Sequence, residues 1–160
     1  MSGAVAGLIA SVQTSTAPSG NLVLNPSFDT DISPWQYSIT RDIVTYRSAP
    51  ASGKVIYDVG AELAITQYTS NGSLTIGQNY SASVWVRNNL GAQDFTLQLI
   101  CGAVGKSTTV SLPISSSWVN IKVENVTCAT NTNLNLLIYG DFYDYNIDDV
   151  SVVTGATAIP

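Results

Sequence analysis

The sequence predicts an all-β protein, an antiparallel β-sandwich or jelly roll with an extended N-terminal arm. Short runs in which apolar and polar residues alternate with a period of two are the first observation. Turn-forming clusters of Gly, Asn, Ser and Pro between these runs are the second, and the near absence of helical spacing is the third. A chain of 160 residues can form one domain with a substantial core. We assign residues 1–20 to the arm, 21–155 to the sandwich domain and 156–160 to a C-terminal tail.

The expected strands follow one another along the sandwich domain. The run "NYSASVWVR", residues 79–87, alternates best, because Val84 and Val86 fall on one face while Trp85 and Arg87 fall on the other. The turn signal "SNGS" is one of several that separate neighbouring runs. The remaining expected strands are 21–28, 42–48, 54–60, 61–70, 95–102, 106–113, 117–128, 134–140 and 146–153.

Composition excludes several classes of function. Charged residues make up only 11% of the chain, and the net charge is −5. This balance disfavours nucleic-acid binding, which needs a basic patch against the phosphates. The chain contains no histidine, so Ser-His-Asp and Cys-His catalysis are excluded and zinc loses its commonest nitrogen ligand. A surface rich in Ser, Thr, Asn and Gln suits an extracellular or particle-borne protein.

Cys101 and Cys128 are the only two cysteines, and both lie in strand-like runs. They are candidates for a disulfide across a sheet, which would indicate an oxidising compartment. The alternative is two buried thiols, because the sequence does not show whether the pairing geometry is met.

The N-terminal arm begins with the apolar stretch "AVAGLIASV". No Lys or Arg precedes it and a Gly interrupts it, which disfavours a secretory signal, and it is too short to span a bilayer. We expect the arm to contact other protein subunits of an assembly.

The stretch "DFYDYNIDDVSVV" near the C-terminus is rich in oxygen ligands. Asp144, Asn146 and Asp148 fit the first, third and fifth positions of an EF-hand, but Asp149 replaces the required Gly and Gly155 the required Glu. The neighbours Asp148 and Asp149 should point to opposite faces of a strand, so they are not expected to form a catalytic pair.

Four motifs in order along the chain resemble carbohydrate-binding modules of the cellulose- and xylan-binding type (families four, nine and twenty-two), which have a galactose-binding-like β-sandwich. The motifs are "NLVLNPSFDTDISPWQ", "SAPASGKVIYDV", "LTIGQNYSASVWVR" and "YNIDDVSVV". The resemblance implies a structural calcium ion at Asp29 and Asp149, with Asp148 as a further ligand. Asp29 stands where the family often has Glu. The alternative is that one aspartate caps a turn and the other is solvated.

Aromatic rings on a polar sheet face are typical of sugar binding, because a ring stacks on the apolar face of a sugar while amides and hydroxyls bind its oxygens. Trp85 is the leading candidate, and we expect its face of the sheet to be solvated. Packing or a protein interface is the alternative role for these aromatics. The candidate glycan-binding residues are Trp85, Arg87, Gln98, Tyr139 and Tyr143.

These observations favour a non-catalytic sandwich displayed on a larger assembly such as a virion, as a structural, decoration or adhesion component that also binds glycans. It would then lie outside the cell or on the virion surface. The alternative is a free secreted carbohydrate-binding module that recognises a plant or cell-wall polysaccharide.

Overall fold

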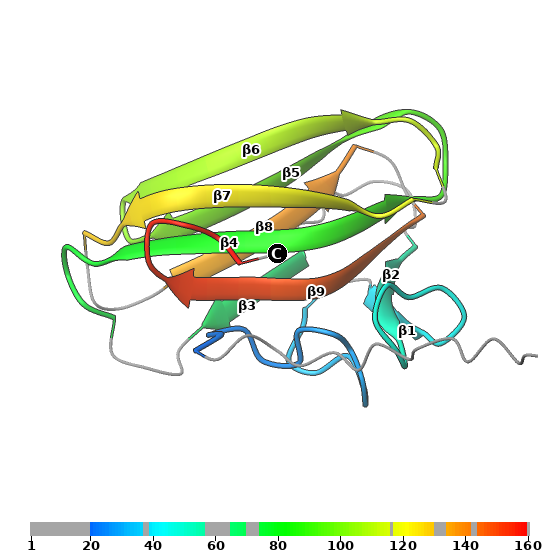
Figure 1. Ribbon diagram of the computed structural model, residues 1–160, viewed down its shortest axis with the longest axis horizontal. Coiled ribbons are helices and arrows are strands. Elements are labelled where there is room, and N and C mark those ends of the chain that lie inside the picture. The colour runs from blue at the N-terminus through cyan, green and yellow to red at the C-terminus, as the bar shows by residue number, and fades with distance from the viewer. Residues whose placement is uncertain are drawn as a thin grey trace, which may run out of the picture.

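The computed structural model describes residues 20–36, 39–56, 65–69, 74–115, 117–129, 134–141 and 144–159, with the backbone alone for 65–69. This part of the chain forms nine β-strands and confirms the all-β prediction (Figure 1). The strands are β1 (Ile39–Asp42), β2 (Ser52–Val55), β3 (Ile65–Thr69), β4 (Asn79–Asn88), β5 (Gln93–Cys101), β6 (Val104–Leu112), β7 (Val119–Thr127), β8 (Leu134–Gly140) and β9 (Tyr145–Thr154).

The strands form two antiparallel sheets. The five-stranded sheet has the order β1-β2-β9-β4-β7, and the four-stranded sheet has the order β3-β8-β5-β6. Each sheet contributes one apolar face to a shared core, as alternation in the sequence predicts. The largest fully buried side chains include Phe95, Leu97 and Leu99 of β5, Leu136 and Ile138 of β8, and Ile147 of β9.

A disulfide joins Cys101, the last residue of β5, to Cys128, the residue after β7. The two Cα atoms are 5.0 Å apart, and both side chains are buried. The bond therefore links the four-stranded sheet to the five-stranded sheet through the core.

The strand expected at 42–48 is wrong, because β1 ends at Asp42 and a loop runs from there to β2. The Asp42 carboxylate accepts hydrogen bonds from the backbone N–H groups of Val44 and Thr45, at 2.8 and 3.1 Å. Such a side-chain turn competes with the sheet for the same backbone groups. We call residues 43–51 the β1–β2 loop.

The opening run 21–28 also forms no strand, although it lies beside β9 as expected. Its backbone makes only isolated bonds to β9, from the N–H of Leu22 to the carbonyl of Val152 at 2.8 Å and from the N–H of Val150 to the carbonyl of Pro26 at 3.0 Å. Trp35, which follows this segment, packs in the core against Phe28.

The C-terminal tail folds back over the outer face of the five-stranded sheet, above β4 (Figure 1). The hydroxyls of Ser83 and Ser151 both donate to the Ile159 carbonyl, at 2.5 and 2.9 Å, and Ser81 donates to the Gly155 carbonyl at 2.9 Å. Within the described ranges, no helix is long and apolar enough to cross a membrane.

Candidate ligand-binding face

The structure separates the predicted glycan-binding residues onto two opposite faces of the molecule. Trp85 and Arg87 point outward from the five-stranded sheet, because their neighbours Val84 and Val86 fill the core. Gln98 and Tyr139 belong to the four-stranded sheet and share its outer face. The expectation that Gln98 joins Trp85 in one site is therefore wrong, since the residues lie on different sheets.

The outer face of the five-stranded sheet is already occupied around Trp85. The face was expected to be solvated, yet Ser81 and Ser83 are fully buried next to the folded-back tail. On the other side, the guanidinium carbon of Arg47 lies 3.8 Å from the centre of the Trp85 ring. Trp85 therefore makes a cation–π contact with Arg47, and that face of the ring is not free to stack on a sugar.

The outer face of the four-stranded sheet is more open, and we call it the ladder face. Thr96 lies at its centre, opposite Tyr139 of β8 and Thr109 of β6, and its hydroxyl is 2.7 Å from that of Thr109. Neighbouring strands lie about 4.8 Å apart, so these side chains form continuous cross-strand rows. The described members of the ladder face are Asp94, Thr96, Gln98 and Ile100 of β5, Gly105, Ser107, Thr109 and Ser111 of β6, and Asn135, Leu137 and Tyr139 of β8.

The ladder face offers hydrogen-bonding groups on a rigid support. Buried leucines and Ile138 alternate with its members along β5 and β8, which holds the outward side chains in fixed rows. The side-chain oxygen of Asn135 is buried and has no hydrogen-bond partner among the described residues.

Sequence reasoning found Gln98 and Tyr139 of this face but missed Thr96, Thr109 and Asn135. The alternation in "FTLQLIC" and "LNLLIYG" already placed these polar positions outward. The missing information was which strands pair and in which register. Tyr143 lies outside the described residues.

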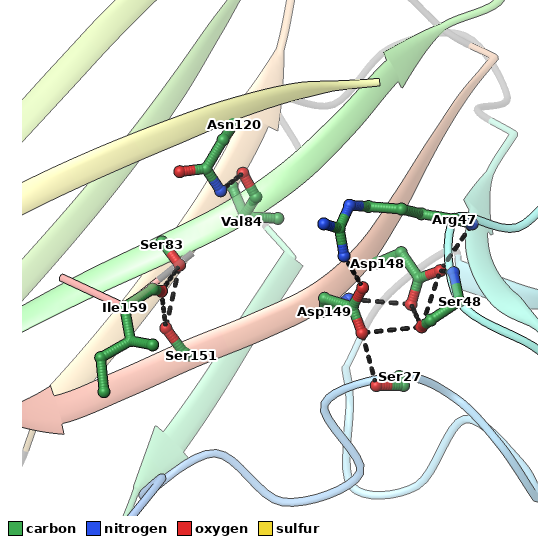
Figure 2. Close-up of polar contacts among 10 residues, drawn as sticks. All are labelled: Ser27, Arg47, Ser48, Ser83, Val84, Asn120, Asp148, Asp149, Ser151 and Ile159. Carbon is green, nitrogen blue, oxygen red and sulfur yellow. Dashed lines mark hydrogen bonds and ion pairs between the residues drawn. The ribbon is translucent and has the colours of Figure 1, made fainter. Parts of the chain in front are cut away.

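The acidic residues of β9 form a second polar cluster. A β-bulge opposite β4 lies between the pairs Trp85–Asp148 and Ser83–Ser151, and Asp149 there has a φ of +46°. The bulge turns Asp149 toward the side of Asp148, so both carboxylates reach the Ser48 hydroxyl, as Figure 2 shows. The expectation that the two carboxylates point to opposite faces is therefore wrong.

Asp148 is fully buried and tightly hydrogen-bonded. Its carboxylate accepts from the backbone N–H groups of Arg47, Ser48 and Asp149, at 2.8, 3.0 and 2.8 Å. Loss of solvation raises the pKa of Asp148 to about 7, the hydrogen bond from Ser48 opposes the rise, and the charge of Asp149 adds to it. Because the carboxylate is enclosed, its raised pKa has a structural cause and exposes no acid to a substrate.

Two of the three predicted calcium ligands, Asp148 and Asp149, are already bonded to other partners. Asp149 pairs with the Arg47 guanidinium, and it also accepts from the hydroxyls of Ser27 and Ser48. Burial and the negative charge of Asp149 raise the pKa of Asp29, while the positive charge of Arg41 opposes the rise. No group of three Asp, Glu, Cys or His side chains in the described ranges is arranged to hold a metal. One oxygen of Asp149 that a calcium ion would need is engaged by the Arg47 guanidinium.

Comparison by sequence finds no relative, because no protein-family model and no curated protein matches the chain. Solved structures do match. A xylan-binding domain of carbohydrate-binding module family 22 covers 89% of this chain and 100% of its own, with 15% identity and a TM-score of 0.70. A family 61 module solved with β-1,4-galactotriose covers 84% of this chain and 99% of its own, with 16% identity and a TM-score of 0.66.

The same fold also occurs in a virus protein. The enzymatically active domain of tailspike protein 4 from bacteriophage CBA120 matches 84% of this chain, with 18% identity and a TM-score of 0.60. This chain corresponds to 21% of that tailspike structure. These likenesses show that the chain has the β-sandwich fold of these carbohydrate-binding modules.

Proposed function

We propose that the chain is a non-catalytic module that binds a neutral polysaccharide on its ladder face. The observation that carries the proposal is the row of uncharged hydrogen-bonding side chains beside the Tyr139 ring. Hydroxyl and amide groups suit the hydroxyls of an uncharged sugar. The described part of the face has a single carboxylate, Asp94, whereas glycoside hydrolysis needs two that flank the bond.

The side chains divide into two roles. Tyr139 is half-buried in β8 and offers its ring as a stacking surface for one sugar. Thr96 and Gln98 lie in neighbouring rows of β5, and Asn135 of β8 lies one row further, opposite Ile100. A polysaccharide that crosses these rows would contact successive hydrogen-bonding groups with successive sugars.

The structural comparisons support this ligand class. The matched structures include a xylan-binding domain and a module solved with β-1,4-galactotriose. The disulfide supports a location outside the cell, because such bonds persist in oxidising compartments.

Tyr139→Ala is expected to weaken binding at least tenfold, because it removes the described stacking ring of the ladder face while the fold remains. We would measure the affinity for soluble xylan, β-1,4-galactan and β-glucan by calorimetry, with wild type and variant both well below their unfolding temperatures. Release of reducing sugar, which we expect to be absent, would be followed in the same samples.

Trp85→Ala is the matched control, since it removes an aromatic ring from the opposite sheet. Equal affinity of wild type and Trp85→Ala, combined with a loss in Tyr139→Ala, supports the ladder face. A loss confined to Trp85→Ala, or no binding to any neutral polysaccharide, would overturn the proposal.

A second candidate role is that of a structural or decoration component of a larger assembly such as a virion. The β1–β2 loop favours it, because Ile43, Val44 and Tyr46 expose 61, 84 and 42% of their surface. The loop is nevertheless fixed by Asp42 and Asp148 through its backbone. A rigid apolar loop loses little entropy on burial, and the tailspike likeness shows that this fold occurs in a virus protein.

The assembly role predicts a defined oligomer in solution that is lost when residues 1–20 are removed, because the arm would contact a neighbouring subunit. Light scattering on the two proteins at several concentrations measures this directly. Val44→Ser in the full chain separates the contribution of the loop from that of the arm. Monomers in all three samples would refute self-assembly through either element and would leave the glycan proposal to its own test.

A further inference from the structure

Three segments meet at the acidic cluster of β9. They are residues 26–29, the β1–β2 loop and the bulge at Asp149, and we call their meeting point the junction. We infer that two arginines of this chain, Arg41 and Arg47, supply the positive charge that holds the junction together in place of a divalent cation. The inference is independent of the ladder face, which lies on the other sheet.

Arg41 holds the first segment through its backbone oxygens. It lies in β1, and its guanidinium donates from Nε to the Phe28 carbonyl at 2.8 Å and from Nη2 to the Asp29 carbonyl at 2.6 Å. Phe28 is fully buried with a φ of +56°, a conformation that is strained for a bulky residue. Two consecutive carbonyls directed at one site resemble a cation cradle, and here the guanidinium occupies it.

Arg47 holds the bulge through its side chain and its backbone together. Its guanidinium pairs with the Asp149 carboxylate, and its backbone N–H donates to Asp148 (Figure 2). The same guanidinium lies over the Trp85 ring. The side chain of Arg47 is 33% exposed and that of Asp149 is 16% exposed, so the pair is partly shielded from water. An ion pair stacked on an aromatic ring is held in one geometry, which favours its contribution to stability.

Each carboxylate of the junction faces a positive charge or hydrogen-bond donors of this chain, without a metal ion. The negative charges of Asp29 and Asp149 face the positive charges of Arg41 and Arg47. The second Asp149 oxygen accepts from two serine hydroxyls, and three backbone N–H groups saturate Asp148. A calcium ion would have to displace both guanidiniums to collect its oxygens and would then lie beside two like charges.

Thermal unfolding with millimolar calcium or with the chelator EGTA tests the inference. The wild type should unfold at the same temperature in both conditions. Arg47→Met should unfold about 4–8 °C lower, because it leaves Asp149 without its ion partner and uncovers Trp85. Arg41→Met should lower the unfolding temperature in the same direction, because the Phe28 and Asp29 carbonyls lose their donor.

Arg87→Met is the matched control, because Arg87 lies on the outer face of the same sheet and no described hydrogen bond or ion pair links it to the junction. It should unfold within about 2 °C of the wild type, because the Arg87 Nε is buried without a hydrogen-bond partner among the described residues and methionine removes no described bond. In the double variant Arg41→Met/Arg47→Met, calcium should raise the unfolding temperature, since the freed oxygens then suit it. Stabilisation of the wild type by calcium would overturn the inference. An Arg47→Met variant no less stable than Arg87→Met would overturn it as well.

Discussion

Asp148→Ala is expected to lower the free energy of unfolding by about 3–5 kcal/mol at pH 5. The alanine leaves three backbone N–H groups without an acceptor at a position that water does not reach. Each unsatisfied buried donor costs about 1–3 kcal/mol, and the β1–β2 loop loses the side chain that fixes its backbone at Arg47 and Ser48. Urea unfolding followed by tryptophan fluorescence measures the difference.

The stability difference between the wild type and Asp148→Ala should depend on pH, whereas a simple loss of packing should not. The folded pKa of Asp148 is about 7, raised above its ordinary value of 3.8. The fold therefore favours the protonated carboxyl, and the stability from this group is fully present below about pH 4 and is lost as the pH rises through about 7. Between pH 5 and pH 9 the wild type should lose stability that the alanine variant does not lose, so the gap between them should narrow.

Asp141→Ala serves as the control, because Asp141 is exposed at the end of β8 and its change should alter stability by less than about 0.5 kcal/mol at either pH. A gap between wild type and Asp148→Ala that widens with pH would show that the charged carboxylate is the stabilising form. That outcome would contradict the raised pKa.

The sheets were predictable where one face of a strand is buried along its whole length. In β4 and β5, residues such as Val84, Val86, Leu97 and Leu99 repeat with a period of two, and this spacing alone identifies the strand and its inward face. The disulfide was one of two alternatives, because the relative position of strand ends on two different sheets is not encoded in local spacing.

The junction was beyond sequence reasoning for a physical reason. The run "DIVTYRS" has the composition of a strand, but Asp42 binds its own downstream N–H groups and Asp148 binds those of Arg47 and Ser48 from about a hundred positions away. The bulge at Asp149 changes the direction of one side chain without a Gly to mark it. Neither contact follows from local spacing.

The sequence predicts the residue types of the ligand-binding face but not the sheet on which they lie. Alternation assigns Trp85 and Gln98 to polar faces correctly, yet two sheets have two outer faces, and local periodicity does not say which strands share one. Nor does it reveal that Arg47 covers Trp85 or that the tail covers Ser83. Tyr139, the aromatic residue among the described members of the ladder face, is a candidate by its position near the C-terminus, and its strand partners follow only from the structure.

Removal of the disulfide is expected to cost about 3–4 kcal/mol, the entropy of closing a loop of this length in the unfolded chain. The bond joins residues 27 positions apart, and it links the last residue of β5 to the residue that follows β7. Both sulfurs lie in the core, so the crosslink also couples the two sheets where they pack together. The double variant Cys101→Ala/Cys128→Ala and the reduced wild type should both unfold at lower urea concentration.

Comparison of these two samples separates the crosslink from the side-chain volume. The reduced wild type keeps both sulfur atoms, whereas the alanine variant also loses their packing, so the variant should be the less stable of the two by about 1–2 kcal/mol. Reductant should have no effect on the variant. Thiol titration in denaturant should find no free thiol in the untreated wild type. Two titratable thiols, or equal stability with and without reductant, would contradict the bond and with it the argument for an oxidising compartment.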